Sequence, residues 1–257
     1  MKKCPICSGD CKSAGNGMYK CLFCGNSFSD ADFEATSVKA DGYAPFAKDA
    51  DHGADLFDRS ISATLDVTCR GKNGSWAGSG YIITESGYAV TNAHVAADTD
   101  GSPCRNIVVK VCNQTVPAAV VALADDKAGH GKGVDLAIIK LLKMPAGATR
   151  LRLEDFSNVK TGERVYVIGN SLGDGACITS GIISDRRRSL GGKTLLMTDC
   201  AINGGNSGGP ILNEKGLVIG TICSARLKQD GSETKGMNYA VPADIVKEFI
   251  DLVGINL

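Results

Sequence analysis

The sequence predicts an all-β fold made of two β-barrels, with a C-terminal helix and a small cysteine-bearing module at the N-terminus. Three observations lead to this prediction. Glycine is abundant, with 32 among 257 residues, whereas aromatic residues make up only 5%. Short runs rich in Val and Ile recur between turn-forming Gly, Asn and Asp, which is typical of many short strands. Five of the 11 cysteines fall before residue 25, so this end is expected to fold by other means.

The N-terminal module, residues 1–28, contains two cysteine pairs of the same spacing, Cys4-x-x-Cys7 and Cys21-x-x-Cys24. Two such pairs on either side of a hairpin-length loop are typical of a zinc ribbon with a structural tetrathiolate site. A unit this small has almost no hydrophobic core. We therefore expect bound Zn²⁺ to supply its folding free energy, on the order of 10 kcal/mol. Spacing alone leaves iron open as the metal. Cys11 is either a spare thiol or a replacement for a neighbouring ligand.

Residues 29–58 form a predicted linker, because Ala, Asp, Lys and Gly predominate there and no hydrophobic period persists. Its last residues, from Asp55 to Ser60, are a candidate short helix that leads into the main domain, residues 59–257. The cysteines of this domain are expected to be thiols, because an odd total count in a reducing compartment fits thiols and a metal better than disulfides.

Strand-like runs follow each other through the main domain without long helices between them, which indicates barrels or sandwiches. The first set is residues 63–69, 80–84, 88–91, 107–111, 118–122 and 136–141, and the second is residues 165–168, 178–183, 194–199, 217–222 and 237–241. Two sets predict two barrels. Pro242 then opens a stretch with apolar residues at helical spacing, and Gly254 closes it, so the chain is expected to end in a helix.

The Gly-rich segment of residues 203–210 carries the strongest catalytic signal, with Ser207 inside the word Asn-Gly-Gly-Asn-Ser-Gly-Gly-Pro. Glycines beside a nucleophilic serine let the backbone turn tightly and point N–H groups at one spot, as an oxyanion hole requires. We expect this hole at Gly205, Asn206 and Ser207, with the N–H groups of Gly205 and Ser207 as the donors.

Two further segments supply the partners that a serine nucleophile needs. His94 follows an apolar strand end, and an imidazole there can take the hydroxyl proton and return it to the leaving amine. Asp135 begins an apolar strand, where its carboxylate can hold the histidine tautomer and stabilise the imidazolium. Each residue alone fits an ordinary structural position. Together, in this order, they predict a Ser-His-Asp catalytic triad.

These segments resemble the HtrA/DegP family of trypsin-like serine proteases. The matching words are residues 91–95, 135–138, 198–210 and 237–242, and the resemblance covers roughly residues 55–257. It implies a trypsin-like double β-barrel with His94, Asp135 and Ser207 in the cleft between the barrels. It further implies a serine endopeptidase that hydrolyses polypeptides through an acyl-enzyme at Ser207.

The resemblance also implies a primary substrate pocket on two segments near the nucleophile. By the family's layout its walls are Ala201, Ile202, Asn203, Gly220, Thr221 and Ile222. No acidic residue falls at its predicted floor, so we expect cleavage after small or medium aliphatic residues. The backbone of residues 221–224 could pair with an extended substrate by strand addition. The triplet Arg186-Arg187-Arg188 lies where the family carries a regulatory loop, and it is interpreted either as a solvated turn or as a sensor.

Charge and the first residues give expectations about location and partners. Acidic and basic residues are equal in number, so no overall field gathers nucleic acid. We expect any nucleic-acid binding by the N-terminal module to be weak. No secretory leader and no apolar run long enough for a membrane span are evident, so we expect a cytoplasmic protein that does not insert into membranes. The resemblance suggests a homotrimer, whereas the partner of the zinc ribbon is unknown.

Three alternatives were weighed against the endopeptidase. An inactive protease-fold protein could bind polypeptides as a chaperone, although an intact triad argues against it. The zinc ribbon could be the main functional part, binding a partner or nucleic acid. A phosphate-binding loop at residues 191–194, Gly-Gly-Lys-Thr, is rejected because Arg187 occupies the position that requires glycine and no long helix follows.

Overall fold

The computed structural model describes residues 2–3, 10–22, 27–30, 52–72, 74–124, 133–227 and 233–257. At the N-terminus, four antiparallel strands pair in the order β1-β2-β3-β4. Their bounds are β1 Lys2–Lys3, β2 Asp10–Gly15, β3 Met18–Cys21 and β4 Ser27–Ser29. Three of the four predicted metal ligands, Cys4, Cys7 and Cys24, lie outside the described residues. The fourth, Cys21, is buried at the end of β3.

Most of the predicted linker lies outside the described residues. The predicted short helix is present as α2, His52–Ser60, and a 3₁₀ turn, η1 Ile61–Ala63, joins it to the first barrel. Leu56 of α2 is fully buried and belongs to the hydrophobic core that both barrels share. The helix is therefore fixed to the main domain by packing.

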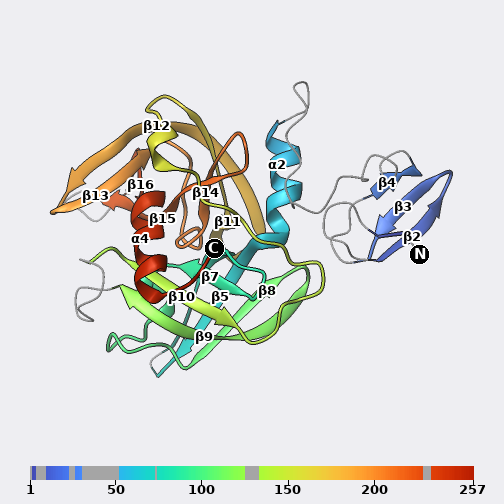
Figure 1. The fold of residues 1–257 in the computed structure, drawn as a ribbon, viewed down its shortest axis with the longest axis horizontal. Coiled ribbons are helices and arrows are strands. Elements are labelled where there is room, and N and C mark those ends of the chain that lie inside the picture. The colour runs from blue at the N-terminus through green and yellow to red at the C-terminus, as the bar shows by residue number, and fades with distance from the viewer. Residues whose placement is uncertain are drawn as a thin grey trace.

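The first barrel closes from six antiparallel strands in the order β10-β7-β6-β5-β8-β9 (Figure 1). A short helix, α3 Ala93–Ala96, follows β7 directly. Buried and more exposed residues alternate along β8 and most of β9, so that one strand face packs inward and the other faces out. The strands are β5 Thr64–Gly71, β6 Gly74–Ile82, β7 Tyr88–Thr91, β8 Asn106–Val111, β9 Gln114–Ala124 and β10 Leu136–Leu141.

The second barrel closes in the order β11-β12-β13-β16-β15-β14. Its strands are β11 Arg164–Asn170, β12 Ala176–Leu190, β13 Lys193–Thr198, β14 Pro210–Asn213, β15 Val218–Leu227 and β16 Glu233–Pro242. Short 3₁₀ turns, η2 Phe156–Asn158 and η3 Ser171–Gly173, lie in its connections. The glycines of the rejected phosphate-loop segment, Gly191 and Gly192, have φ of 57° and 78° and form the tight hairpin turn between β12 and β13.

The predicted two barrels and C-terminal helix are confirmed. Helix α4, Ala243–Val253, ends at Gly254, whose left-handed φ of 79° lets its N–H cap the helix. Figure 1 shows α4 in red across the junction of the two barrels. Its buried residues Val246, Phe249 and Ile250 join a core cluster that also contains Ile138 of β10 and Leu212 of β14. The two barrels therefore share one of the core clusters, which α4 helps to form.

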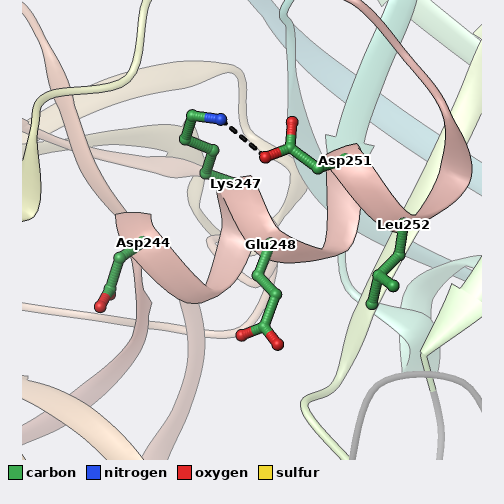
Figure 2. Close-up of a pocket in the computed structure, with 5 residues that line it drawn as sticks. All are labelled: Asp244, Lys247, Glu248, Asp251 and Leu252. Carbon is green, nitrogen blue, oxygen red and sulfur yellow. Dashed lines mark hydrogen bonds and ion pairs between the residues drawn. The ribbon is translucent and has the colours of Figure 1, made fainter.

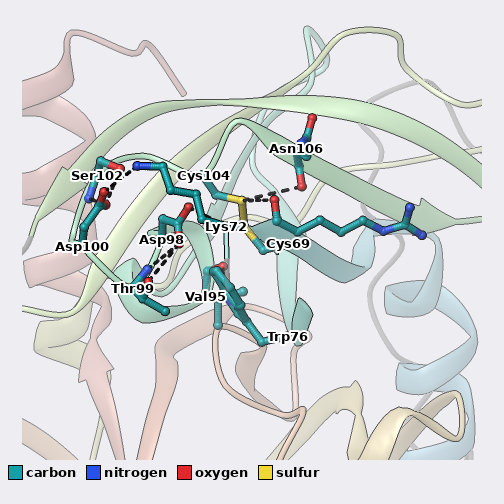
Figure 3. Close-up of a disulfide and its surroundings, with 11 residues drawn as sticks. Cys69, Lys72, Trp76, Val95, Asp98, Thr99, Asp100, Ser102, Cys104 and Asn106 are labelled. Atoms are coloured by element: carbon teal, nitrogen blue, oxygen red, sulfur yellow. Dashed lines mark hydrogen bonds and ion pairs between the residues drawn. A yellow bond between two sulfur atoms is a disulfide. The ribbon is translucent and has the colours of Figure 1, made fainter. Parts of the chain in front are cut away.

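A disulfide joins Cys69 of β5 to Cys104, contrary to the expectation that the main-domain cysteines are all thiols (Figure 3). Both cysteines are buried in the first barrel, at 0% and 3% exposure. The prediction failed because the two residues are 35 positions apart and only the barrel brings their Cα atoms to 6.5 Å. That separation lies within the range that a disulfide spans.

The helices among the described residues are all too short or too polar to cross a lipid bilayer.

Candidate active site

His94 and Asp135 are brought together by the pairing of β7 with β10. His94 lies in α3, just beyond β7, and Asp135 immediately precedes β10, whose Ala137 pairs with Thr91. The His94 Nδ1 atom is 2.7 Å from Asp135 Oδ2, and the His94 backbone N–H donates to Asp135 Oδ1 at 3.0 Å. The carboxylate thus fixes both the ring and the backbone of the histidine.

Asn92 holds the backbone of the aspartate in the same arrangement. Its side chain is fully buried, and its Nδ2 donates to the Asp135 carbonyl at 2.8 Å. Because Nδ1 of His94 faces a carboxylate, the neutral ring carries its proton on that nitrogen. The other ring nitrogen, Nε2, is then available as a base. The imidazole is half exposed, so it can meet a substrate.

The Gly-rich loop between β13 and β14 presents Ser207. The Asn206 N–H donates to the Asn203 carbonyl at 3.1 Å, so of the three predicted oxyanion-hole residues Asn206 uses its N–H within the loop. Among the described residues, the N–H groups of Gly205 and Ser207 have no intramolecular acceptor. Gly205 has a φ of 97°, which a side chain would disfavour. Two unpaired N–H groups flanking one bonded N–H are what an oxyanion hole needs.

A hydrogen bond and close packing hold the same loop next to the residues around His94. The Ser207 carbonyl accepts the N–H of Ser79, on β6, at 2.7 Å. At Gly78, a β-carbon would lie 2.6 Å from Val95 Cγ2 and 3.0 Å from the Ser207 carbonyl oxygen. Because Gly78 has no side chain, Val95 and the backbone of Ser207 can both pack against it. Among the described residues no hydrogen bond joins the Ser207 hydroxyl to His94, a contact that commonly tightens only when substrate binds.

Ser79 is a site residue that the sequence analysis missed. Its hydroxyl donates to the Gly205 carbonyl at 2.7 Å and accepts the N–H of Asn170 at 2.9 Å. In the sequence it is one small residue just before the predicted strand of residues 80–84, flanked by Gly78 and Gly80. The flanking glycines were the available signal, because they indicate close approach of another backbone segment.

The predicted pocket residues occupy two different environments. Ala201 and Asn203 are exposed, and the Asn203 amide donates to the Ser171 hydroxyl at 3.0 Å. Thr221 instead directs its hydroxyl into the interior, 2.8 Å from the Tyr81 hydroxyl.

The remaining three predicted pocket residues, Ile202, Gly220 and Ile222, are buried. Backbone bonds link Ile222 to Gly208 and Gly209 on the nucleophile loop. Ala201 and Asn203 therefore offer more surface to a ligand than the four buried residues of the predicted pocket.

The arginine triplet lies within β12 and makes structural contacts. Arg186 donates to the Phe156 carbonyl at 3.0 Å, and Arg187 forms an ion pair with Asp244. Arg187 also stacks over the Phe156 ring, 4.6 Å from its centroid. These contacts connect β12 to η2 and to the first turn of α4. The triplet is therefore more than a solvated turn.

An open hollow on the outer face of α4 is separate from this site (Figure 2). It is lined by Asp244, Lys247, Glu248, Asp251 and Leu252. Lys247 donates to Asp251 at 2.7 Å, a pair of the i,i+4 type that is common on helix surfaces. With no nucleophile or histidine in its lining, the hollow does not compete with Ser207 as the candidate active site.

Known proteins resemble this chain in sequence and in fold. Residues 78–220 match the family described as "Trypsin-like peptidase domain". The chain is 34% identical over 173 residues to a "Probable periplasmic serine endoprotease DegP-like" of Pseudomonas putida, covering 65% of this chain and 33% of that protein. A protein of the same description from Rhizobium meliloti is 36% identical over 177 residues, covering 68% of this chain and 32% of its own. The chain thus spans about a third of the length of these curated relatives.

Among solved structures, "HtrA-type protease AlgW with tripeptide" superposes with a TM-score of 0.66 at 28% identity, covering 78% of this chain and 62% of that one. The chain belongs to the trypsin-like peptidase domain family. Within that family, the predicted resemblance to HtrA/DegP proteases and the predicted trypsin-like fold are confirmed by both kinds of relative.

The expectation of a cytoplasmic location is wrong. The curated relatives of this chain are named periplasmic endoproteases. The expectation rested on the first residues of the chain and on the lack of an apolar run long enough for a membrane span. The Cys69–Cys104 disulfide agrees with the correction, because such bonds persist in oxidising compartments and are rare in the cytosol.

Proposed function

We propose that this chain hydrolyses peptide bonds in polypeptides, with Ser207 as nucleophile, His94 as general base and Asp135 as the group that orients His94. One observation carries the proposal: the 2.7 Å contact between His94 Nδ1 and Asp135 Oδ2. The Ser207 loop is held next to this pair by the hydrogen bond from Ser79. An imidazole held in this way presents Nε2 to a serine hydroxyl, which is too weakly acidic to attack a carbonyl unaided.

In the first half of the reaction, His94 Nε2 takes the proton of the Ser207 hydroxyl as its oxygen bonds to the substrate carbonyl carbon. The carbonyl oxygen becomes an oxyanion, which the N–H groups of Gly205 and Ser207 are free to receive. The imidazolium then gives its proton to the leaving amine as the C–N bond breaks, leaving an acyl group on Ser207. In the second half, a water molecule attacks the acyl carbon with His94 as its base, and the peptide acid is released as Ser207 regains its proton. Asp135 stays ionised throughout and stabilises the imidazolium.

For specificity, we propose a small, uncharged primary pocket at residues 201–203, beside the nucleophile loop. Ala201 and Asn203 are exposed beside the nucleophile loop, and neither carries a charge that would select a basic residue. A pocket of this kind favours small or medium aliphatic side chains, with modest discrimination among them.

For the N-terminal module, we propose a structural zinc site made by Cys4, Cys7, Cys21 and Cys24. Supporting this, Lys3 pairs with Asp10 across β1 and β2, and Lys20 pairs with Ser27 across β3 and β4. In a four-stranded antiparallel meander the first and third connections leave the same end of the sheet. The first connection carries Cys4 and Cys7, and the third carries Cys24, three residues after Cys21 at the end of β3. Zinc there would hold the module together, and the module would serve targeting or assembly of the protease.

The test of the endopeptidase is labelling with a fluorophosphonate, read by intact mass and peptide mapping, on the wild type beside Ser207→Ala and His94→Ala. We expect one label per chain at Ser207, absent from the first variant and strongly slowed in the second, together with hydrolysis of an unfolded polypeptide. A folded wild type that neither takes the label nor hydrolyses unfolded polypeptide, even when that polypeptide is present during labelling, would contradict the proposal.

A further inference from the structure

We propose that Ser79 is a positioning residue that holds the oxyanion hole in shape from the opposite barrel. This inference rests on the proposed function and deepens it. Ser79 lies on β6 of the first barrel and is fully buried, whereas the loop it contacts belongs to the second barrel. Its hydrogen bonds link β7, which leads to His94, with the loop that carries Ser207 and with the end of β11.

Ser79 makes hydrogen bonds through its side chain and through both polar groups of its backbone. The hydroxyl accepts from the Asn170 N–H at 2.9 Å and donates to the Gly205 carbonyl at 2.7 Å. The backbone N–H donates to the Ser207 carbonyl at 2.7 Å. The backbone carbonyl accepts from the Thr91 hydroxyl, also at 2.7 Å. A single residue thus bonds to both ends of the Gly205–Ser207 segment and to the strand that leads to His94.

The contact with the Gly205 carbonyl matters because Gly205, like the other glycines of the loop, has little intrinsic restriction on its backbone angles. It has no side chain and a φ of 97°. Fixing its carbonyl fixes its ψ, and so fixes the direction of the Gly205–Asn206 peptide. The N–H groups of Gly205 and Ser207 lie on either side of that peptide. An oxyanion hole works only when its donors are oriented before the charge develops.

The surroundings of the hydroxyl leave room for serine and for little else. At Gly169, a β-carbon would lie 2.9 Å from Ser79 Oγ and 2.8 Å from Asn206 Oδ1. At Gly208, a β-carbon would overlap the Ser79 carbonyl and the Thr91 hydroxyl. These glycines therefore allow Ser79 to be enclosed on two sides. An alanine at position 79 would leave the buried Gly205 carbonyl and Asn170 N–H without their partner.

The experiment compares Ser79→Ala with Thr64→Val, a control that removes another buried hydroxyl bonded to a backbone carbonyl, at 3.0 Å, in the same barrel. For each protein, kcat and KM on a peptide substrate, the rate of fluorophosphonate labelling and the thermal midpoint are measured. We expect Ser79→Ala to lower kcat and the labelling rate by roughly 10- to 100-fold with KM within about threefold, since only transition-state contacts are lost. Thr64→Val should change the midpoint with little effect on kcat.

Ser79→Cys keeps a side chain of similar size with a weak donor, so it should recover part of the lost kcat. It also replaces the alanine variant in the comparison if that variant fails to fold. A Ser79→Ala protein with the kcat and labelling rate of Thr64→Val would overturn the positioning role and leave the endopeptidase standing. If only Ser79→Cys folds, the same result with that variant would overturn it, because its weak donor predicts a partial loss of kcat. A wild type that neither labels nor hydrolyses would remove the proposed function and this inference with it.

Discussion

The N-terminal module and the two barrels are stabilised in different ways. Among the described residues of the module, Cys11, Cys21 and Phe28 are the buried apolar side chains. The barrels contain three clusters of buried Ile, Leu, Val and aromatic residues. Burial of apolar surface is the dominant favourable term in folding, and a sheet as small as the module has too little of it. The difference teaches that cysteine density and core size vary inversely along this chain, and that each region should respond to a different perturbation.

The largest expected effect is on the module. In Cys21→Ser, loss of one thiolate should abolish zinc binding and unfold residues 1–28, because metal binding supplies on the order of 10 kcal/mol to such a unit. Peptide hydrolysis by the barrels should stay within about twofold, since the catalytic groups lie elsewhere. Zinc content by mass spectrometry, limited proteolysis and peptide kinetics measure the three quantities.

Cys11→Ser is the matched control, because Cys11 pairs directly with Cys21 across β2 and β3 and is equally buried. Full zinc content in Cys11→Ser identifies Cys11 as a spare thiol. Zinc retained in Cys21→Ser but lost in Cys11→Ser would exchange the roles of the two residues. A module that stays folded after metal is removed would contradict the contrast with the barrels.

A smaller effect is expected within the first barrel. Replacing both Cys69 and Cys104 by serine should lower the free energy of unfolding by about 3 kcal/mol, because the disulfide closes a 35-residue separation in the unfolded chain. Cys104 also donates its N–H to Ala96, two residues from His94, so activity should fall earlier on heating. Urea denaturation with Cys177→Ser as control measures the change. Equal stability of the double variant and the control would show that the bond contributes nothing.

The smallest expected effect concerns pH in the second barrel. Burial raises the pKa of the Cys200 thiol from 9.0 to about 11. The folded state therefore keeps a proton that the unfolded chain loses, and stability should decline as pH rises from about 9 to about 11, by about 1.4 kcal/mol per unit at most. In Cys200→Ala this part of the decline should disappear. Denaturation at about pH 8 and about pH 11 would show it, and equal slopes for the two proteins would refute it.

Much of the fold and site could be predicted because the signals are local. The strand runs, the helix after Pro242, and the order of His94, Asp135 and Ser207 are all visible within short windows of sequence. Strand β14 was missed because its four residues follow directly on the Gly-rich loop and have no turn signal of their own. The disulfide and the bonds of Ser79 depend on residues that are far apart in sequence, which no local pattern reports. Thr221 was assigned to the pocket by the family's layout, which does not report the bond between its hydroxyl and that of Tyr81.

The shared interior of the barrels has a consequence for dividing the chain. Tyr81 of β6 and Thr221 of β15 bond at 2.8 Å, and one cluster contains Val90, Tyr166 and Phe249, from the two barrels and α4. A cut in the connection between β10 and β11 would leave each half with an uncovered apolar face and one half of the candidate catalytic set. Such halves should be insoluble or disordered alone and regain hydrolysis when mixed, which would make this chain a natural scaffold for a split reporter whose signal depends on reassembly.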